Sequence, residues 1–238
     1  MLLIIESGST KTEWRFIKDA SAEYETHISP GINPYYQRIE EIIQAQAKAL
    51  TWLEGKAISY VYYYGTGITG EEKKDQIRDF LVPYVGQAQI SIENDLIAAA
   101  YALCGNEKGI ACILGTGSNS GYFEGGVLVE QVPPLGFWLG DEGSGGHLGK
   151  RLVLAYLHHE LPTDLRDLFI KRFGALGRLD ILAKAYQGEF PNRWFASFSK
   201  FLFDHRRHPF CYQLVVDSFT EFLEKYVLKY GQKTEVPI

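Results

Sequence analysis

The first half of the chain alternates between short apolar runs and longer amphipathic stretches. Leu2–Ser7 is apolar, Gly8–Thr10 consists of turn-forming residues, and Thr12–Lys18 alternates around Trp14 and Phe16. This pattern predicts two strands joined by a tight turn. By the same reasoning we expect strands at Ala22–Ile28, Ile58–Tyr64 and Gln89–Glu93, and helices at Tyr35–Leu53, at Glu71–Tyr84 and from Asn94 or Asp95 to Cys104.

The same pattern restarts in the second half of the chain. Gly109–Leu114 is apolar, Gly115–Asn119 consists of small residues, and strands are expected at Ser120–Phe123 and Val127–Val132. Strand, small-residue loop and strand therefore occur twice, about a hundred residues apart, which indicates two related halves. We expect an α/β protein with domains at 1–107 and 108–238, the second rich in helices at Glu142–His159, Thr163–Phe173, Asp180–Gln187, Asn192–His205 and Pro209–Tyr230.

The last residues have an unusual pattern. Thr234–Ile238 reads as the opening of another strand. Because a stable fold rarely begins a strand at its last residue, we expect the second domain to be truncated at its C-terminus.

Composition places the chain among ordinary globular proteins. Hydrophobic residues make up 46% and charged residues 22%, and the formal net charge is −5 at pH 7. A chain with this balance has no general attraction to nucleic acid or to an anionic membrane surface, so we expect neither as a partner. Any phosphate that it binds must be held by local donors.

Cysteine usage and hydropathy predict the compartment. Cys104, Cys112 and Cys211 form no CxxC pair, which favours a reducing environment. Met1–Ile5 is too short for a signal peptide. The longest apolar run, Leu96–Cys104, is far below the roughly 18 residues that a membrane span needs. These features predict a soluble, cytoplasmic protein.

Two loops have the composition of phosphate-binding turns, because small residues let backbone N–H groups approach a phosphate and hydroxyls add donors. Neither fits the P-loop pattern or the pattern of dinucleotide-binding loops. Either alone would be an ordinary hairpin turn more often than not, but the pair at matching places in two halves favours phosphate binding. The first loop is Gly8, Ser9, Thr10, Lys11 and Thr12, and the second is Gly115, Thr116, Gly117, Ser118 and Asn119.

Asp95 follows a predicted strand and opens a predicted helix. A carboxylate there lies at the mouth of an α/β sheet, where ligands bind. It could accept a proton from a sugar hydroxyl that attacks phosphorus. The equally weighted alternative is a helix N-cap, a role that suits both Asp95 and Asn94.

Gly140–Gly146 combines glycines with two acidic residues before a long predicted helix. Asp141 or Glu142 could hydrogen-bond sugar hydroxyls or hold Mg²⁺ through water. The alternative is a capped helix start, although this many glycines weaken a helix and so favour a function. The histidines at His158–His159 and His205–His208 lack the spacing of a zinc site, and the aromatic residues of Phe190–Phe203 have the spacing of a helix core.

Five ordered motifs resemble the N-acetylglucosamine kinase family, which with the BadF/BadG-type ATPases belongs to the actin, hexokinase and heat-shock chaperone ATPase superfamily. The resemblance is specific from Leu2 to about Leu152, and weaker beyond. The motifs are Glu6–Thr12, Gly31–Pro34, Asn94–Asp95, Leu114–Asn119 and Gly140–Ser144.

The resemblance implies two ribonuclease-H-like domains around a cleft for Mg-ATP and sugar. It implies that Gly8–Thr12 and Gly115–Ser118 bind the phosphates and that Asp95 is the base for the sugar 6-hydroxyl. It implies sugar-binding positions at Asn33, Asp95 and Asp141. Asn119, beside the second loop and facing the cleft, and Glu142, in the same signature with a less defined role, are further sugar-binding candidates.

Two departures from the family pattern qualify this reading. The first motif normally begins with Asp, and here Glu6 stands at that position. Its extra methylene moves the carboxylate enough to disturb a water-mediated Mg²⁺ contact. The family's adenosine-binding Gly-rich motif follows a strand near the C-terminus, where this chain stops, so we expect weak ATP binding by the chain ending at Ile238.

The resulting hypothesis is an ATP- and Mg²⁺-dependent kinase that phosphorylates the 6-hydroxyl of N-acetylglucosamine or a related amino sugar, and that could be a homodimer. One alternative is a non-catalytic sugar sensor of the same fold, which Glu6 motivates. Another is a BadF-type ATPase that activates a reductase through an iron–sulfur cluster. That requires suitably placed cysteines, whereas Cys104 and Cys112 lie in or beside apolar segments.

Overall fold

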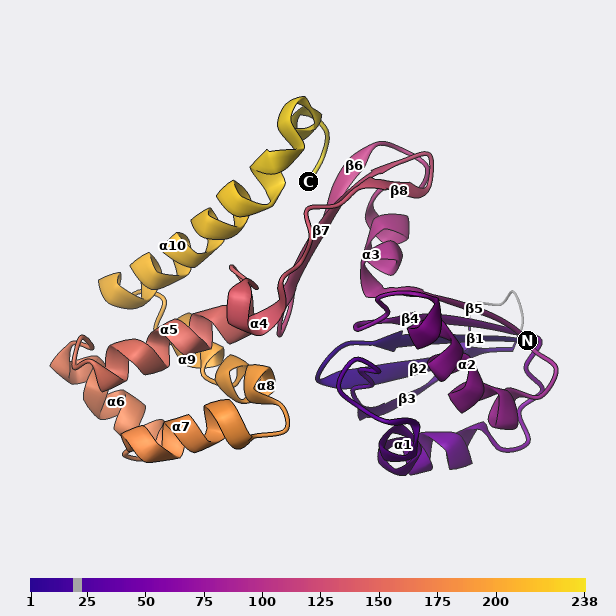
Figure 1. Ribbon diagram of the computed structural model, residues 1–238, viewed down its shortest axis with the longest axis horizontal. Helices are drawn as coiled ribbons and strands as arrows, with labels where there is room; N and C mark the ends of the chain where they lie inside the picture. Colours follow the sequence, from indigo (N-terminus) through magenta and orange to yellow (C-terminus); the bar gives the residue numbers. More distant parts are fainter. Residues whose placement is uncertain (19–22) are drawn as a thin grey trace. The chain divides into compact units, whose positions relative to one another are not determined.

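The computed structural model describes residues 1–18 and 23–238, and for 232–235 it describes only the main chain. Within it the chain forms two compact units, Met1–Gly105 and Asn106–Ile238 (Figure 1). Each unit combines a sheet with helices, so the predicted α/β class is confirmed. The description of the two units as ribonuclease-H-like domains stays a prediction.

The first unit is built on a five-stranded mixed sheet in the order β3-β2-β1-β4-β5. The central strand β1 is antiparallel to β2 and parallel to β4. The strands are β1 (Leu2–Ser7), β2 (Lys11–Ile17), β3 (Tyr24–Pro30), β4 (Tyr60–Gly65) and β5 (Gln89–Asn94), and the helices are α1 (Ile39–Leu53), α2 (Glu71–Val85) and α3 (Asp95–Leu103).

Side-chain alternation along the strands of this sheet decides which helices cover which face. Tyr63 and Tyr64 are neighbours on β4, so they point to opposite faces. Tyr63 is buried in the core that α1 and α2 share with the sheet. Tyr64 packs edge-to-face on Tyr101 of α3, with ring centroids 6.5 Å apart. The helices α1 and α2 therefore cover one face, and α3 packs on the other.

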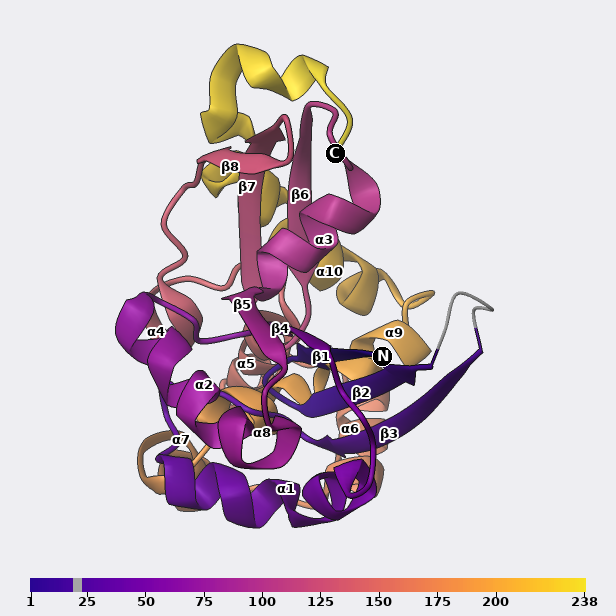
Figure 2. The same cartoon turned by 90° about the vertical axis from the view of Figure 1, so that its right-hand side faces the viewer.

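The second unit has a small antiparallel sheet, β6-β7-β8, and a set of helices (Figure 2). Most of the helices share one core, which contains Phe169, Phe198 and Phe201. A second core joins the sheet to the end of the chain. The strands are β6 (Gly109–Leu114), β7 (Ser118–Glu124) and β8 (Val127–Glu130), and the helices are α4 (Gly136–Leu139), α5 (Gly145–Leu157), α6 (Thr163–Phe173), α7 (Arg178–Gln187), α8 (Pro191–Ala196), α9 (Ser199–Asp204), α10 (Pro209–Lys225) and the 3₁₀ segment η1 (Val227–Glu235).

The predicted elements are found with shifted ends, and four expectations need correction. The helix expected from Tyr35 begins at Ile39, the one from Glu142 begins at Gly145, and the one at Asn192–His205 is divided into α8 and α9. No strand forms at Thr234–Ile238. There η1 continues to Glu235, and beyond it the carbonyl of Pro237 accepts from the N–H of Ile110 on β6 at 2.9 Å. The start of the strand expected from Ala22 lies outside the described residues.

Within the described residues, no helix is both long enough and apolar enough to cross a membrane.

Candidate active site

The first predicted phosphate loop connects two paired strands of the first unit. Ser7 and Thr12 are opposite each other in the β1–β2 ladder, and the N–H of Gly8 donates to the carbonyl of Lys11 at 3.0 Å. Gly31 supports the loop from behind, because its N–H donates to the carbonyl of Thr10 at 3.1 Å. The loop is therefore a short turn held against a neighbouring segment.

A buried hydroxyl pair anchors this loop to the sheet. The hydroxyl oxygens of Ser7 and Thr12 lie 2.7 Å apart. Ser7 accepts from the N–H of Ile32 at 2.9 Å, and Thr12 donates to the carbonyl of Pro30 at 3.0 Å. Both side chains are fully buried. Thr12, which was predicted to bind phosphate, is therefore placed in the scaffold under the loop, whereas Gly8, Ser9, Thr10 and Lys11 are partly or fully exposed.

Asn33 lies on the segment that follows Gly31. Its side-chain oxygen accepts from the N–H of Tyr35 at 3.0 Å, and its own N–H donates to Gln37 at 2.7 Å. Gly67 adopts a φ of +76°, and a Cβ there would collide with the Asn33 amide. These contacts fix the orientation of the amide and direct its oxygen to the protein, which leaves the NH₂ group as the donor for a ligand.

Asp95 begins α3 without being its cap. The cap is Asn94, whose side-chain oxygen accepts from the N–H of Leu96 at 2.9 Å. Burial raises the pKa of Asp95 to about 6; the Leu96 N–H opposes this shift and the carboxylate of Glu6 adds to it. The structure thus assigns the cap to Asn94 and leaves Asp95 as a buried carboxyl with a raised pKa at the start of α3.

Glu6 lies at the end of β1 on the first unit. Burial raises the pKa of its carboxyl, with Lys11 opposing and Glu13 adding to the shift. Among the described residues no group of three His, Cys, Asp or Glu side chains is arranged to hold a metal. A single carboxylate suits an ion such as Mg²⁺ that keeps several waters and is bound mainly by phosphate oxygens.

The second predicted phosphate loop connects β6 to β7. The carbonyl of Gly115 accepts from the N–H of Gly145 at 2.8 Å, and the carbonyl of Thr116 accepts from the N–H of Gly146 at 3.0 Å. Both carbonyls therefore point to the start of α5. Because C=O and N–H point in opposite directions across a planar peptide, the N–H groups of Thr116 and Gly117 point away from α5, as a phosphate cradle requires.

Asp141 is held beside this loop. It adopts a left-handed φ of 64°, which is uncommon outside glycine, and its carboxylate accepts from the N–H of Ser118 at 3.2 Å. Burial raises the pKa of Asp141, and the Ser118 N–H opposes this. A Cβ on Gly117 would lie 2.9 Å from a carboxylate oxygen of Asp141. The glycine therefore allows the carboxylate to approach the loop.

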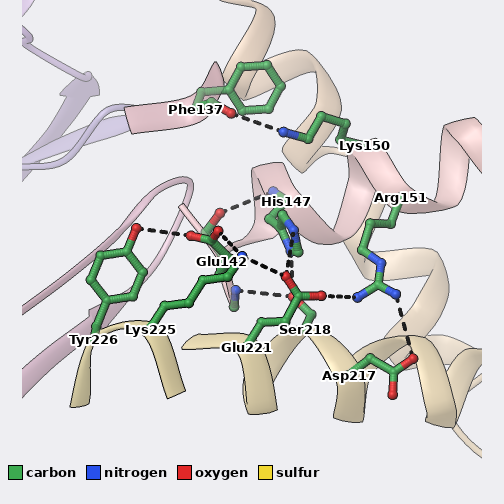
Figure 3. Close-up of polar contacts among 12 residues, drawn as sticks. Phe137, Glu142, His147, Lys150, Arg151, Asp217, Ser218, Glu221, Lys225 and Tyr226 are labelled. Carbon is green, nitrogen blue, oxygen red and sulfur yellow. Dashed lines mark hydrogen bonds and ion pairs between the residues drawn. The ribbon is translucent and has the colours of Figure 1, made fainter. Parts of the chain in front are cut away.

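Asn119 and Glu142 are both engaged by other side chains. The side-chain oxygen of Asn119 accepts from Gln131 at 2.9 Å. One oxygen of Glu142 accepts from the ammonium of Lys225 at 2.6 Å and the other from the hydroxyl of Tyr226 at 3.0 Å (Figure 3). Burial acts to raise the pKa of Glu142, but the donors outweigh it and the pKa is lowered. Glu142 is thus paired within the unit.

The sequence analysis missed the partners of Glu142. Lys225 and Tyr226 lie on and just after α10, more than eighty residues along the chain, and no local pattern signals their role. The free cysteines also have environments that sequence cannot give. Burial raises the pKa of Cys112 and Cys211 to about 11, so these thiols are poorly suited to bind a cluster as thiolates.

Comparison with solved structures finds close similarity to sugar kinases. The putative N-acetylglucosamine kinase from Porphyromonas gingivalis is 38% identical, with a TM-score of 0.84, over 98% of this chain and 82% of that one. The putative N-acetylglucosamine kinase from Chromobacterium violaceum is 18% identical, with a TM-score of 0.74, over 99% of this chain and 85% of that one, which shows a shared fold. No protein-family profile and no curated protein matches the sequence.

Proposed function

The chain belongs to the same family as the putative N-acetylglucosamine kinase of Porphyromonas gingivalis, and on that basis we propose that it is an ATP-dependent amino-sugar kinase. The reaction transfers the γ-phosphoryl group of ATP to the 6-hydroxyl of N-acetylglucosamine or a related amino sugar. The observation that carries the chemistry is Asp95, a carboxylate at the end of β5 that is not the helix cap and has a raised pKa.

Asp95 is the proposed base. At pH 7 its carboxylate is ionised in about a tenfold excess over the acid, since its pKa is about 6. It accepts the proton of the sugar hydroxyl as that oxygen attacks the γ-phosphorus. The bond from phosphorus to the β–γ bridging oxygen breaks and ADP leaves. Such transfers depend mainly on positioning and charge stabilisation.

The two loops are the proposed phosphate-binding elements. The N–H of Gly8 is held by the Lys11 carbonyl and that of Ser118 by the Asp141 carboxylate, so the backbone N–H groups of Ser9 and Gly117 are the proposed donors to phosphate oxygens, and Lys11 adds a positive charge. Glu6 would hold Mg²⁺ through water, and the ion would supply charge neutralisation at the phosphate oxygens. Thr12 supports the first loop through its buried hydroxyl.

Asn33 and Asp141 are the proposed sugar contacts, because each side chain is fixed by the protein. Asn119 can contribute only its NH₂ group, since its oxygen accepts from Gln131. For Glu142 the pairing with Lys225 and Tyr226 favours a different role, in which it holds the Asp141 segment in place.

An ADP-release assay with Mg-ATP tests this proposal, using glucosamine, N-acetylglucosamine, N-acetylmannosamine and glucose as acceptors. We expect turnover with an amino sugar and its loss in Asp95→Asn. The matched control is Asp75→Asn, which changes an exposed carboxylate on α2. Sugar-induced thermal stabilisation without ADP release from any sugar would overturn the kinase and favour a sugar sensor, the second candidate, which Glu6 supports.

A further inference from the structure

The segment between α4 and α5 contains two residues in the left-handed region within three positions. Asp141 has a φ of 64° and Gly143 a φ of 79°. For Asp141 this conformation costs on the order of 1 kcal/mol and persists only where the surroundings impose it. A Cβ on Gly143 would lie 2.9 Å from the Cβ of Phe222 on α10. The segment is therefore packed closely against α10, and also against the side chain of Leu114 at the end of β6, which would lie 3.1 Å from the same Cβ.

One hydroxyl on α10 restrains the middle of this segment. Ser218 is fully buried, and its oxygen accepts from the N–H of Gly143 at 3.1 Å. The same oxygen lies 2.8 Å from Nδ1 of His147 on α5 (Figure 3). Ser218 thus joins the segment, α5 and α10 at one point.

The hydroxyl of Ser218 can serve both neighbours. It accepts from the N–H of Gly143, and its one proton is available to donate to Nδ1 of His147. This arrangement places the imidazole proton on Nε2. That nitrogen lies 4.0 Å from a carboxylate oxygen of Glu221 on α10. A protonated Nε2 is favoured there, because the carboxylate attracts an N–H group and repels a nitrogen lone pair.

The charges around His147 agree with a neutral ring. Burial lowers the pKa of His147; Glu221 opposes this shift, and Lys150 and Arg151 add to it. Glu221 is already paired with Arg151 at 3.1 Å and Lys225 at 3.2 Å. Its negative charge is therefore shared with two cations and does not require an imidazolium.

From this geometry we infer that Ser218 and the neutral Nε2–H form of His147 are a positioning pair, which holds Gly143 and so keeps the Asp141 carboxylate against the second loop. The functional half of this inference rests on the proposed function, in which Asp141 contacts the sugar. Neither Ser218 nor His147 touches the sugar in this account. They act through the main chain at Gly143 and through the left-handed turn at Asp141.

Two measurements that do not need kinase activity test the pair. Long-range ¹H–¹⁵N NMR of the protein should show His147 as the Nε2–H tautomer at pH 7; the Nδ1–H tautomer or an imidazolium would overturn the assignment. Ser218→Ala should speed amide hydrogen exchange about tenfold at Gly143. Exchange should also speed up at Ser118, because the Ser118 N–H donates to the Asp141 carboxylate. Unchanged exchange at Gly143 would also overturn it. Ser197→Ala, which removes an exposed hydroxyl at the end of α8, is the matched control.

Steady-state kinetics test the link to the sugar. Ser218→Ala and His147→Leu should each raise the KM for the amino sugar about tenfold, as expected for one lost hydrogen bond. His147→Asn should stay within about twofold of the parent protein, because its amide oxygen can accept the Ser218 proton. If His147→Asn raises the KM as much as His147→Leu does, the imidazole acts only by packing and not as a hydrogen-bond acceptor. Absence of turnover with every sugar would refute the kinase proposal. The NMR and amide-exchange results would still show whether Ser218 and His147 restrain Gly143.

Discussion

Gly31 lies directly against the main chain of Ser9, so that a Cβ added to Gly31 would be 2.6 Å from the Ser9 carbonyl carbon. The two residues belong to different turns of the first unit. Real side chains never approach this closely, so the position requires glycine for reasons of space. The first predicted phosphate loop thus owes its shape to a residue more than twenty positions further along the chain.

We predict that Gly31→Ala displaces the first loop. The overlap with main-chain atoms should cost about 1–3 kcal/mol of unfolding free energy and raise the Kd for Mg-ATP about tenfold. Urea unfolding and calorimetric titration measure the two effects. The control is Gly70→Ala, where a Cβ meets nothing within 4 Å. Full ATP affinity in Gly31→Ala would contradict a role for this loop.

The pH dependence of turnover should report the ionisation of Asp95. Its pKa is about 6, and a base must be deprotonated to act. We expect kcat/KM for the amino sugar to fall about tenfold for each pH unit below 6 and to level off above it. A profile that stays flat from pH 5 to 8 would exclude Asp95 as the base.

The same carboxylate should cost stability at neutral pH. Burial raises the pKa of Asp95 from 3.8 to about 6, so the folded state binds the proton more tightly than the unfolded state. The resulting penalty is absent below pH 3.8, grows between pH 3.8 and about 6, and is constant at higher pH. We therefore expect Asp95→Asn to be more stable by about 1 kcal/mol at pH 7, a value reduced for residual solvent exposure, with no gain at pH 4.

The pairing of Glu142 can be separated from direct sugar binding. If Glu142 only holds its segment, Glu142→Gln and Lys225→Met should raise the KM for the sugar by similar factors, because both break the same ion pair. If Glu142 contacts the sugar, Glu142→Gln should have much the larger effect. Initial-rate kinetics on the two variants distinguish the cases, with Gln213→Ala on the exposed side of α10 as a control.

The ion pair between Glu142 and Lys225 should also make the free energy of unfolding fall at acid pH. The pKa of Glu142 is lowered from its ordinary value of 4.5, so its contribution is present above pH 4.5 and is lost as pH falls through the folded-state value. We expect Glu142→Gln to be less stable than the parent protein by about 1 kcal/mol at pH 7, since Lys225 is half exposed. The difference should shrink as pH falls below 4.5.

The sequence by itself predicted the strands that form, most helices and the two loops, and was wrong about a strand at Thr234–Ile238. These features depend on local patterns, because alternation at Leu2–Ser7 and Gly109–Leu114 and the small residues that follow them are read from neighbouring positions. The aromatic residues of Phe190–Phe203 were likewise predicted to be core. The structure buries Phe195, Phe198 and Phe201 but leaves Phe203 exposed. The division of α8 from α9 was not predicted, because the apolar spacing continues across the break.

The tertiary structure alone decided which of the candidate residues are available to a ligand. Asn94 and Asp95 were equal candidates for the helix cap, and only the placed side chains assign the cap to Asn94. The burial of Thr12 depends on contacts between separate segments. So do the pairing of Glu142 with Lys225 and the restraint of Gly143 by Ser218. Local propensity carries no information about such contacts, because they form only when segments distant in the chain pack together.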